Sequence, residues 1–424
     1  MSAEARTLKE IPAPRAFGLT GATRRIVFSA LEQLEGGAID LKLPDGTRER
    51  FGDGRGPEFA VTIANGDLFG RLTRRGRSGL GEGYIARDWD TDDLPGLLAL
   101  LIRNARSAAK RQPVSTLALL QRARPRLVAP RTFTRARRDI HYHYDLGNEL
   151  FQLFLDPSMT YSCAYFEREE QTLEEAQQAK YRRLCEKLSI GPEDRVLEIG
   201  CGWGGFALHA ARERGAHVTG LTISNEQHAF ATQRVRQAGL GERIEIRLCD
   251  YRALEGSFSK IASIEMFEAI GYRQFKTFFS RCDELLEPSG LAAIQTIAVP
   301  DQRFHTYRRR PDWIQQYIFP GSLLPSITAM SKAMAKASGL MVTDVEEIGY
   351  GYARTLRSWR AAFLDNLAEV KRLGYDDRFI RTWLYYLASC EALFETRSLR
   401  NVQLVMTRSY NDGLAHYPAA RVTF

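Results

Sequence analysis

The segment VLEIGCGWGGF, residues 196–206, predicts the fold of the larger part of the chain. Its apolar first half is typical of a buried β-strand that ends at Gly200, and further glycines then lead into a helix of small residues. Glycine permits a sharp turn between a strand and a helix and lets the backbone approach a ligand closely. The pattern alone is as compatible with a packing turn as with a nucleotide or nucleoside site.

Strand-like and helix-like segments alternate from about Lys180 onward. The strand-like segments are RVLEIG, HVTGLTIS, IEIRLCD, KIASIEMF and LAAIQTI, which begin at residues 195, 217, 244, 260 and 291. This alternation predicts an α/β fold in which crossover helices connect the strands of a parallel sheet. Residues 355–410 are predicted to form terminal amphipathic helices.

The second predicted strand narrows the choice of ligand. Enzymes that bind NAD usually carry an acidic residue about 20 residues after the glycines, where it binds the ribose hydroxyls. Here that region is GLTIS, with Thr222 and Ser224 and without a carboxylate, so NAD is disfavoured. Glu198 beside the glycines and Asp250 after the strand IEIRLC offer acceptors for amine, ribose or adenine groups. This combination suits S-adenosylmethionine.

The N-terminal part, residues 20–100, is predicted to form a small mixed unit. A helix is expected at residues 22–34, followed by short strands within 38–52 and 59–72 with Asp-Gly and Asn-Gly hairpin turns. Residues 79–104 are expected to form a turn and then a helix with a nearly continuous apolar face. This unit carries no recognisable catalytic group of residues.

Length and composition indicate a globular protein with two domains. The 424 residues exceed the size at which one core normally stops growing, and 44% hydrophobic with 26% charged residues is ordinary. The six cysteines are scattered without CxxC pairs, which argues for a reducing compartment and against structural zinc. The N-terminus lacks an apolar signal segment, and no later stretch is long and apolar enough to span a membrane, so we expect a cytoplasmic protein.

A strongly basic segment extends from Arg103 to Arg138, with eleven Lys or Arg and no Asp or Glu. Such a charge run is often a solvated linker, but it also suits an anionic membrane surface or a nucleic acid. Because it lacks the interleaved aromatic residues of nucleic-acid-binding signatures, we favour lipid over nucleic acid. Composition alone leaves the linker and the membrane-binding interpretations open.

Nine longer segments carry a family resemblance. They are HYDLGNELF (143–151), MTYSCAYF (159–166), AQQAKYRRLCEKL (176–188), VLEIGCGWGG (196–205), GLTIS with Gln227 (220–227), DYRAL (250–254), MFEAIG (266–271), QYIFPGSLLPS (316–326) and GYARTLRSW (351–359). Their order along the chain and their residues resemble those of the cyclopropane-fatty-acyl-phospholipid synthase family, which includes the mycolic acid cyclopropane synthases. The resemblance covers about residues 140–410, and YSCAYF and YIFPG are far more specific than the glycine turn.

The resemblance implies a class I S-adenosylmethionine-dependent methyltransferase fold, which is Rossmann-like with a mostly parallel sheet. The catalytic domain would be residues 141–424, with a helical C-terminal part. Residues 1–105 would then form a small α+β lipid-binding domain, and residues 106–140 a basic linker. The protein would associate peripherally with the inner face of the membrane, and a homodimer is one assembly that the resemblance allows.

The implied reaction adds a methylene group from S-adenosylmethionine to the cis double bond of an unsaturated acyl chain in a membrane phospholipid. The alkene attacks the sulfonium methyl group, a carbocation forms, and a bound bicarbonate ion removes a proton so that a cyclopropane ring closes. Such a cation needs an apolar pocket that excludes water and a base that is held in place. By resemblance, the backbones of Cys163 and Ile297 and the side chains of Glu268 and Tyr352 hold the bicarbonate, and Gln295 completes this set.

The resemblance also implies the residues that bind S-adenosylmethionine. Taken alone, aromatic residues such as Tyr161 and Tyr251 would more often belong to a core. The set comprises Tyr161 and Ser162 at the methionine end, Gly200 and Gly202 at its backbone, Thr222, Ile223 and Gln227 around the ribose, Tyr251 near adenine, and Asp250 from the strand-end argument above.

One position departs from the family and opens a second interpretation. The family usually has histidine two residues before the isoleucine, whereas this chain has Gln295. Glutamine donates and accepts hydrogen bonds but carries neither a titrating proton nor a positive charge. The alternative to cyclopropanation is therefore a related fatty-acyl phospholipid C-methyltransferase with a methylene- or methyl-branched product. A lipid-binding protein with a decayed catalytic domain is a third interpretation, against which the intact glycines, Glu268 and YSCAYF count.

Overall fold

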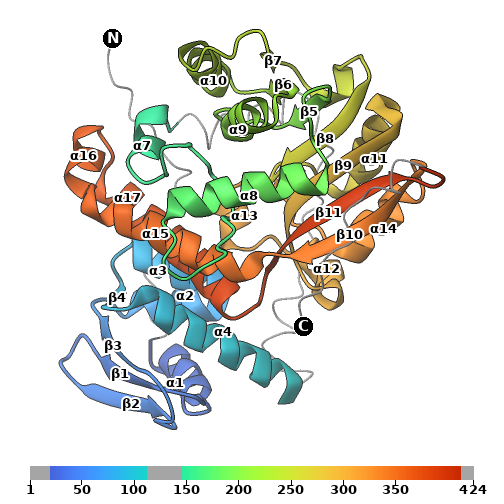
Figure 1. Ribbon diagram of the computed structural model, residues 1–424. Helices are drawn as coiled ribbons and strands as arrows, with labels where there is room; N and C mark the ends of the chain where they lie inside the picture. The colour runs from blue at the N-terminus through green and yellow to red at the C-terminus, as the bar shows by residue number, and fades with distance from the viewer. Residues whose placement is uncertain (1–19, 112–145, 412–424) are drawn as a thin grey trace. The chain divides into compact units, whose positions relative to one another are not determined.

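The computed structural model describes residues 20–111 and 146–411, which form two compact units (Figure 1). The first unit contains the described residues up to 111 together with 309–320 and 359–398. The remaining described residues form the second unit. Residues 309–320 and 359–398, which the sequence prediction includes in the catalytic domain, thus pack with the N-terminal helices. The predicted linker, 106–140, lies almost entirely outside the described residues.

The first unit combines a small sheet with helices. Its elements are α1 (Thr20–Leu31), β1 (Ala38–Lys42), β2 (Arg48–Gly52), β3 (Glu58–Ile63), α2 (Asp67–Arg75), α3 (Arg77–Ile85), β4 (Trp89–Thr91), α4 (Leu94–Arg111), α13 (Trp313–Tyr317), α16 (Leu367–Arg372) and α17 (Asp377–Glu395). The strand order is β2-β1-β3-β4, in which β1 and β3 are parallel and the other two pairs are antiparallel.

One of the two predicted hairpins is present in this unit. Strands β1 and β2 pair antiparallel around the Asp-Gly turn, where Gly46 has a φ of +86°, so this prediction is confirmed. The hairpin predicted at Asn65 is wrong, because a helix begins there instead. The Asn65 Oδ1 atom accepts a hydrogen bond from the backbone N–H of Asp67, the first residue of α2.

Residues 79–104 are predicted to begin with a turn, but residues 79–85 belong to helix α3 instead. Its glycines permit close packing within the first unit. A Cβ atom at Gly79 would lie 2.3 Å from the Arg71 carbonyl oxygen, and one at Gly81 would lie 2.6 Å from the Tyr385 ring. These glycines allow other residues to pack closely against the helix, and they do not reverse the chain. The sequence pattern does not distinguish a glycine in a packed helix from a glycine in a turn.

The second unit contains a seven-stranded sheet among the described residues. Its elements are α7 (Asn148–Gln152), α8 (Leu173–Lys187), β5 (Arg195–Ile199), α9 (Gly205–Arg214), β6 (His217–Thr222), α10 (Asn225–Gln237), β7 (Ile244–Leu248), η1 (Tyr251–Ala253), β8 (Phe258–Ile264), η2 (Phe267–Ala269), η3 (Tyr272–Gln274), α11 (Phe275–Leu285), β9 (Leu286–Ala298), α12 (Asp301–Tyr307), α14 (Ile327–Met334), β10 (Leu340–Glu347), η4 (Gly349–Gly351), the first half of α15 (Tyr352–Asp365), and β11 (Arg400–Arg408).

In the strand order β10-β11-β9-β8-β5-β6-β7, six of the described strands run in the same direction and β11 runs antiparallel to both of its neighbours. The five predicted strands are all present, and the predicted α/β class I methyltransferase fold is confirmed. Strand β11 contradicts the prediction that residues 355–410 are helical, and it inserts between β10 and β9 (Figure 1). All seven of its interior residues are buried, so it lacks the alternation that marks a half-exposed strand.

Helices cover both faces of this sheet. Alternate strand residues pack on opposite sides, since Val196 lies in a core with α8, α9 and α10, whereas Leu197 lies in a core with α11 and α14. The parallel strands are therefore apolar on both faces, as crossover architectures require. Within the described residues, no helix is both long enough and apolar enough to cross a membrane.

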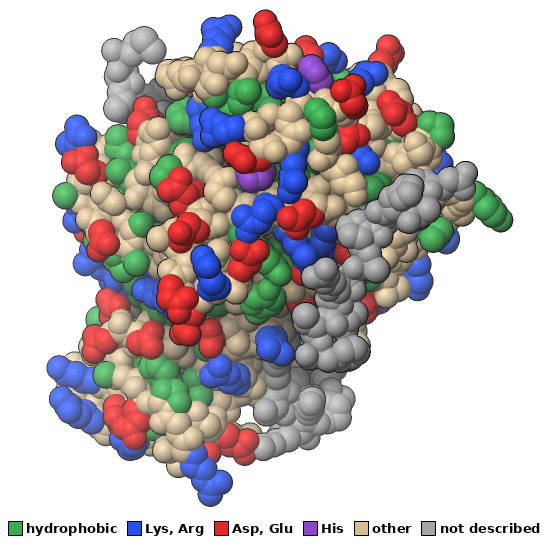
Figure 2. All heavy atoms as spheres, viewed as in Figure 1, with side chains coloured by type: hydrophobic (Ala, Val, Ile, Leu, Met, Phe, Trp, Pro, Cys, Tyr) green, Lys and Arg blue, Asp and Glu red, His purple; other side chains and the backbone are tan. Residues whose placement is uncertain are grey.

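Acidic and basic side chains are interspersed on the face of the described chain drawn in Figure 2. The basic segment from Arg103 to Arg138 lies mostly outside the described residues. Its predicted contact with an anionic membrane surface thus stays a prediction from the sequence.

Candidate active site

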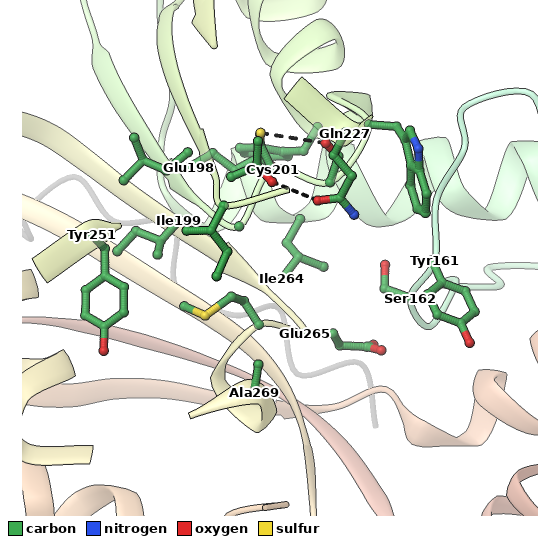
Figure 3. Close-up of a pocket in the computed structure, with 18 of the residues that line it drawn as sticks. Tyr161, Ser162, Glu198, Ile199, Cys201, Gln227, Tyr251, Ile264, Glu265 and Ala269 are labelled. Atoms are coloured by element: carbon green, nitrogen blue, oxygen red, sulfur yellow. Dashed lines mark hydrogen bonds between the residues drawn. The ribbon is translucent and has the colours of Figure 1, made fainter. Parts of the chain in front are cut away.

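A pocket in the second unit lies at the carboxyl ends of β5, β6 and β8, the edge at which open α/β sheets bind ligands. Figure 3 shows side chains from separate segments around this common space. The structure brings together all nine residues predicted to bind the cofactor, which are Tyr161, Ser162, Gly200, Gly202, Thr222, Ile223, Gln227, Asp250 and Tyr251.

The turn after β5 presents backbone to the pocket. Gly200 and Gly202 have φ values of +85° and +52°, a region that residues with a side chain rarely adopt. A Cβ atom at Gly202 would meet no described atom within 4 Å, so the absence of a side chain here leaves space open. A Cβ atom at Gly200 would instead overlap the Met266 side chain. The turn therefore fits a ligand that approaches the backbone closely.

The segment containing Tyr161 and Ser162 is held by two charged side chains, of which one is half-buried and the other buried. Arg234 of α10 donates to the carbonyl oxygens of Ser158, at 2.9 Å, and Trp203, at 2.8 Å, and so joins this segment to the glycine turn. Lys180 of α8 is fully buried and donates from Nζ to Ser162 Oγ at 2.7 Å. Burial lowers the pKa of the Lys180 amine to about 8. The contacts fix one wall of the pocket.

Another part of the pocket wall is preorganised by local hydrogen bonds after β6. The Thr222 hydroxyl donates to Gln227 Oε1 at 2.8 Å, and Ser224 caps helix α10 through the Gln227 N–H. Asp250 lines the pocket, but both of its carboxylate oxygens accept hydrogen bonds from Arg252. A ligand that donates a hydrogen bond to Asp250, as predicted, would therefore compete with Arg252 for the carboxylate oxygens.

Two buried polar atoms of the pocket wall, Glu198 Oε2 and Tyr251 Oη, have no hydrogen-bond partner within the described part of the chain. Burial raises the pKa of the Glu198 carboxyl to about 8. Buried polar atoms normally find partners, and an unpaired one at a pocket marks a contact for a ligand or water. Together with the glycine turn, these atoms fit a nucleoside-type ligand such as S-adenosylmethionine.

The residues predicted to hold bicarbonate gather beside this pocket, but three of them contact a protein carboxylate. Glu265 Oε1 accepts hydrogen bonds from the Cys163 backbone N–H at 2.8 Å and from Gln295 Nε2 at 3.0 Å. Glu265 Oε2 accepts one from the Tyr352 hydroxyl at 2.6 Å. Glu265 itself lines the cofactor pocket, and in Figure 3 its carboxylate points toward the side of Ser162 and Tyr161.

The other two predicted residues, Glu268 and Ile297, contact each other. The Ile297 N–H donates to Glu268 Oε1, while Glu268 Oε2 has no partner among the described residues. Burial, reinforced by the negative charge of Glu265, raises the pKa of the Glu268 carboxyl to about 8. The residues predicted to hold bicarbonate thus contact two different carboxylates. Cys163, Gln295 and Tyr352 donate to Glu265, whereas Ile297 donates to Glu268.

Three residues that the sequence prediction lacks complete this cluster. Glu265 directly follows β8, Asn401 Nδ2 donates to its Oε1 at 2.6 Å, and Gln403 Nε2 donates to Gln295 Oε1 at 3.0 Å. Gln403 thereby leaves the Gln295 amide nitrogen to face Glu265. Two signals were available, namely a carboxylate at the end of a parallel strand and amides within the apolar run NVQLVM. Within the described residues, no group of three or more His, Cys, Asp or Glu could hold a metal ion.

The chain is similar in sequence to known proteins. The chain is 38% identical over 377 residues to the tuberculostearic acid methyltransferase UfaA1 of Mycobacterium tuberculosis, which covers 87% of this chain and 88% of that protein. It is 36% identical over 354 residues to the cyclopropane-fatty-acyl-phospholipid synthase of Escherichia coli, which covers 84% of this chain and 89% of that protein.

A solved structure extends the similarity to three dimensions. The mycolic acid cyclopropane synthase CmaA1, complexed with SAH and CTAB, superposes with a TM-score of 0.60 at 32% identity, covering 64% of this chain and 98% of that one. Residues 131–404 match the family described as mycolic acid cyclopropane synthetase. The chain belongs to this family of S-adenosylmethionine-dependent enzymes.

Proposed function

We propose that this enzyme transfers the methyl carbon of S-adenosylmethionine to the cis double bond of an unsaturated acyl chain in a membrane phospholipid. The observation that carries the proposal is the junction of two sites at Glu265. This residue lines the cofactor pocket and also accepts hydrogen bonds from Cys163 and Tyr352. Methyl transfer to an alkene followed by loss of a proton needs a methyl donor and a held base next to each other.

Each wall of the pocket has a role in this reaction. The glycine turn and the Thr222–Gln227 pair would position the methyl donor, and Lys180 keeps Ser162 in place at its methionine end. The alkene forms a bond to the methyl carbon as the carbon–sulfur bond breaks, which leaves a cation on the acyl chain. Because Tyr161 packs edge-on against Phe151, with ring centroids 5.3 Å apart, this wall is aromatic and suits a cation that must avoid water.

Ring closure to a cyclopropane is the first product that we propose. The proton then leaves from the new methyl group, and its bonding electrons close the ring. The relative in Escherichia coli is named a cyclopropane-fatty-acyl-phospholipid synthase. Bicarbonate, which the family resemblance implies as the base, stays a prediction, and its predicted donors Cys163, Gln295 and Tyr352 contact Glu265.

A methylene or methyl branch is the second candidate, and Gln295 favours it. Gln295 is fully buried and takes the place of the family histidine, so a neutral amide faces the carboxylate. A relative with a similar degree of identity is named a tuberculostearic acid methyltransferase. Gln295→His tests the influence of this position on the product. A changed ratio of ring to branch, measured by NMR of the isolated acyl chains, would show that the residue directs the cation.

Association with the membrane surface is part of the proposal. The basic segment Arg103–Arg138 supports attraction to anionic lipid, with each Lys or Arg near the surface contributing on the order of 1 kcal/mol. Vesicle binding should therefore weaken as salt concentration rises. A homodimer stays a prediction from the family resemblance alone.

The proposed function is tested with S-adenosylmethionine carrying a 13C-methyl group and vesicles of phosphatidylglycerol with cis-monounsaturated chains. We expect labelled carbon in the acyl chains, and none with otherwise identical saturated lipid. NMR of the product distinguishes the ring from a branch, which have the same mass when the branch is a methylene. Binding of the donor without labelled lipid, under conditions where the protein is folded and bound to vesicles, would contradict the proposal.

A further inference from the structure

The carboxylate of Glu265 occupies a cluster of donors from four separate parts of the second unit. They are the Cys163 N–H, the Gln295 amide of β9, the Tyr352 hydroxyl at the start of α15, and the Asn401 amide of β11. All four partners can donate, as an acceptor-only, ionised carboxylate requires. An arrangement of this kind fits an anion that is fixed in position.

The donors are distributed unequally between the two oxygens. Among the described residues, Oε1 accepts three hydrogen bonds, from Cys163, Gln295 and Asn401, whereas Oε2 accepts one, from Tyr352. A carboxylate has about four lone-pair sites, two on each oxygen. Oε1 is therefore saturated, and Oε2 retains a lone pair that can receive a proton.

The backbone of Glu265 is held in an unusual conformation. Its φ is +50°, in the left-handed region that costs about 1–2 kcal/mol for a residue with a side chain. The Glu265 N–H donates to the Gln295 carbonyl oxygen at 2.8 Å, which ties this strained turn to β9. Non-glycine residues of this kind cluster at active sites, where the surrounding structure enforces them. The strain here directs a carboxylate toward the pocket at the end of β8.

We infer that Glu265 is the catalytic base, so that a side chain of the protein replaces bicarbonate in this enzyme. The inference rests on the proposed function, since it assigns the proton acceptor of the same reaction. The pocket-facing position of Glu265 and its four donors carry it.

The proton transfer balances without a further reactant. The alkene's π electrons form the new carbon–carbon bond, and the sulfonium sulfur keeps the electron pair of the broken bond. Glu265 Oε2 takes a proton from the new methyl group, and the released C–H electrons close the ring. For a branch, a hydride first moves from the methylated carbon to the cationic carbon, and the same proton loss then forms an exocyclic double bond. The resulting carboxylic acid returns its proton to solvent.

The hydrogen bonds also explain how a carboxylate avoids alkylation beside a methyl donor. Three donors on Oε1 and one on Oε2 reduce the electron density available for attack on the methyl group. A weak base suffices for the intended step, because a carbocation makes the neighbouring C–H bonds strongly acidic. The competing explanation is that Glu265 only joins β8, β9 and β11 as a structural group.

The first test uses the wild-type enzyme in buffer from which carbon dioxide has been removed. We expect turnover in the labelling assay to be unchanged when bicarbonate is then added at millimolar concentration. Activity that appears only with bicarbonate would overturn the assignment of Glu265 while leaving the proposed methyl transfer intact. No labelled lipid under either condition would refute the proposed function itself and the inference with it.

The second test compares two variants at the same site. Glu265→Gln keeps the shape and should lower kcat by about 10²–10⁴, the usual contribution of a general base, with the affinity for S-adenosylmethionine retained. Glu265→Gly suits the left-handed backbone and vacates the donor cluster, so added bicarbonate should restore part of its turnover. Glu284→Gln, an exposed residue of α11, is the matched control and should behave as wild type. Turnover of Glu265→Gln close to that of wild type would refute the inference, and so would a Glu265→Gly variant that binds the donor but stays inactive with bicarbonate.

Discussion

The active site has two halves that are built differently. The half that would bind S-adenosylmethionine comes mainly from successive strand ends between Gly200 and Tyr251, where backbone and short-range hydrogen bonds shape the pocket. The half that would accept the proton comes from Cys163, Gln295, Tyr352 and Asn401, which meet only in the folded chain. The first half follows from the general fold, whereas the second depends on the antiparallel strand β11. Chemistry can therefore change in the second half while the first is preserved.

Among the variants that separate the two halves, Tyr352→Phe should have the largest effect on turnover. It removes the hydrogen bond to Oε2 of Glu265, the oxygen that we assign as the base. A hydrogen bond to a charged group contributes about 1.5–3 kcal/mol, so kcat should fall by about 10- to 100-fold. The dissociation constant for S-adenosylmethionine, measured by calorimetry, should stay unchanged, since Tyr352 contacts the second half. Equal losses in kcat and in affinity would show that the two halves are not separable.

The sequence allowed the residues of the first half to be placed around one pocket, because their signals are local. The strand VLEI, the glycines and the Thr222–Gln227 pair lie within about one crossover unit, and their periodicity determines where they come together. The second half is different. Glu265 is adjacent in sequence to residues of the recognised motif MFEAIG, yet its partners lie 102, 30, 87 and 136 positions away. Because β11 lacks an alternating pattern, nothing local placed Asn401 beside Glu265.

Gly202→Ala tests the first half of the site and should have the next largest effect, which is on the affinity for S-adenosylmethionine. A methyl group at this position would enter open space at the pocket wall, so the affinity for S-adenosylmethionine should fall about tenfold, or 1.4 kcal/mol. Gly239→Ala is a matched control, because Gly239 is exposed, has a φ of +68° and likewise has no atom within 4 Å of an added Cβ. Both variants should lose similar stability to left-handed strain of about 1–2 kcal/mol. If Gly239→Ala weakened binding equally, backbone strain rather than occupied space would be the cause.

A pH series addresses the second carboxylate of the second half. The Glu268 pKa rises from 4.5 to about 8 through burial and the charge of Glu265. The folded state then binds more protons than the unfolded state between these values. The free energy of unfolding should fall as pH rises from 4.5 to 8, by at most about 1.4 kcal/mol per pH unit from this group.

Glu268→Gln should make this fall shallower, because an amide resembles the protonated carboxyl and keeps an acceptor for the Ile297 N–H. Urea unfolding of both proteins at several pH values between 5 and 8 measures the slope. Glu198, whose pKa burial also raises to about 8, should contribute equally to both proteins and leave a residual fall. Parallel curves for the two proteins would mean that Glu268 is ionised in the folded state throughout this range.

Cys163→Ser should have the smallest effect, because the second half uses the backbone of this residue. Its N–H donates to Glu265, while the contacts of its buried thiol with described residues are long ones, to the carbonyl oxygens of Ala164, at 3.4 Å, and Ile348, at 3.6 Å. Burial and the charge of Glu265 raise the pKa of this thiol, which makes a reactive thiolate unfavourable beside a methyl donor. Turnover should change by no more than about threefold, the size of a weak hydrogen bond.

Cys282→Ser, at an equally buried thiol of α11, controls for the cost of placing a hydroxyl in the core. If Cys163→Ser alone abolished turnover while both variants stayed folded, the thiol itself would take part in the reaction, and the second half would need a nucleophile that the hydrogen bonds of Glu265 do not supply.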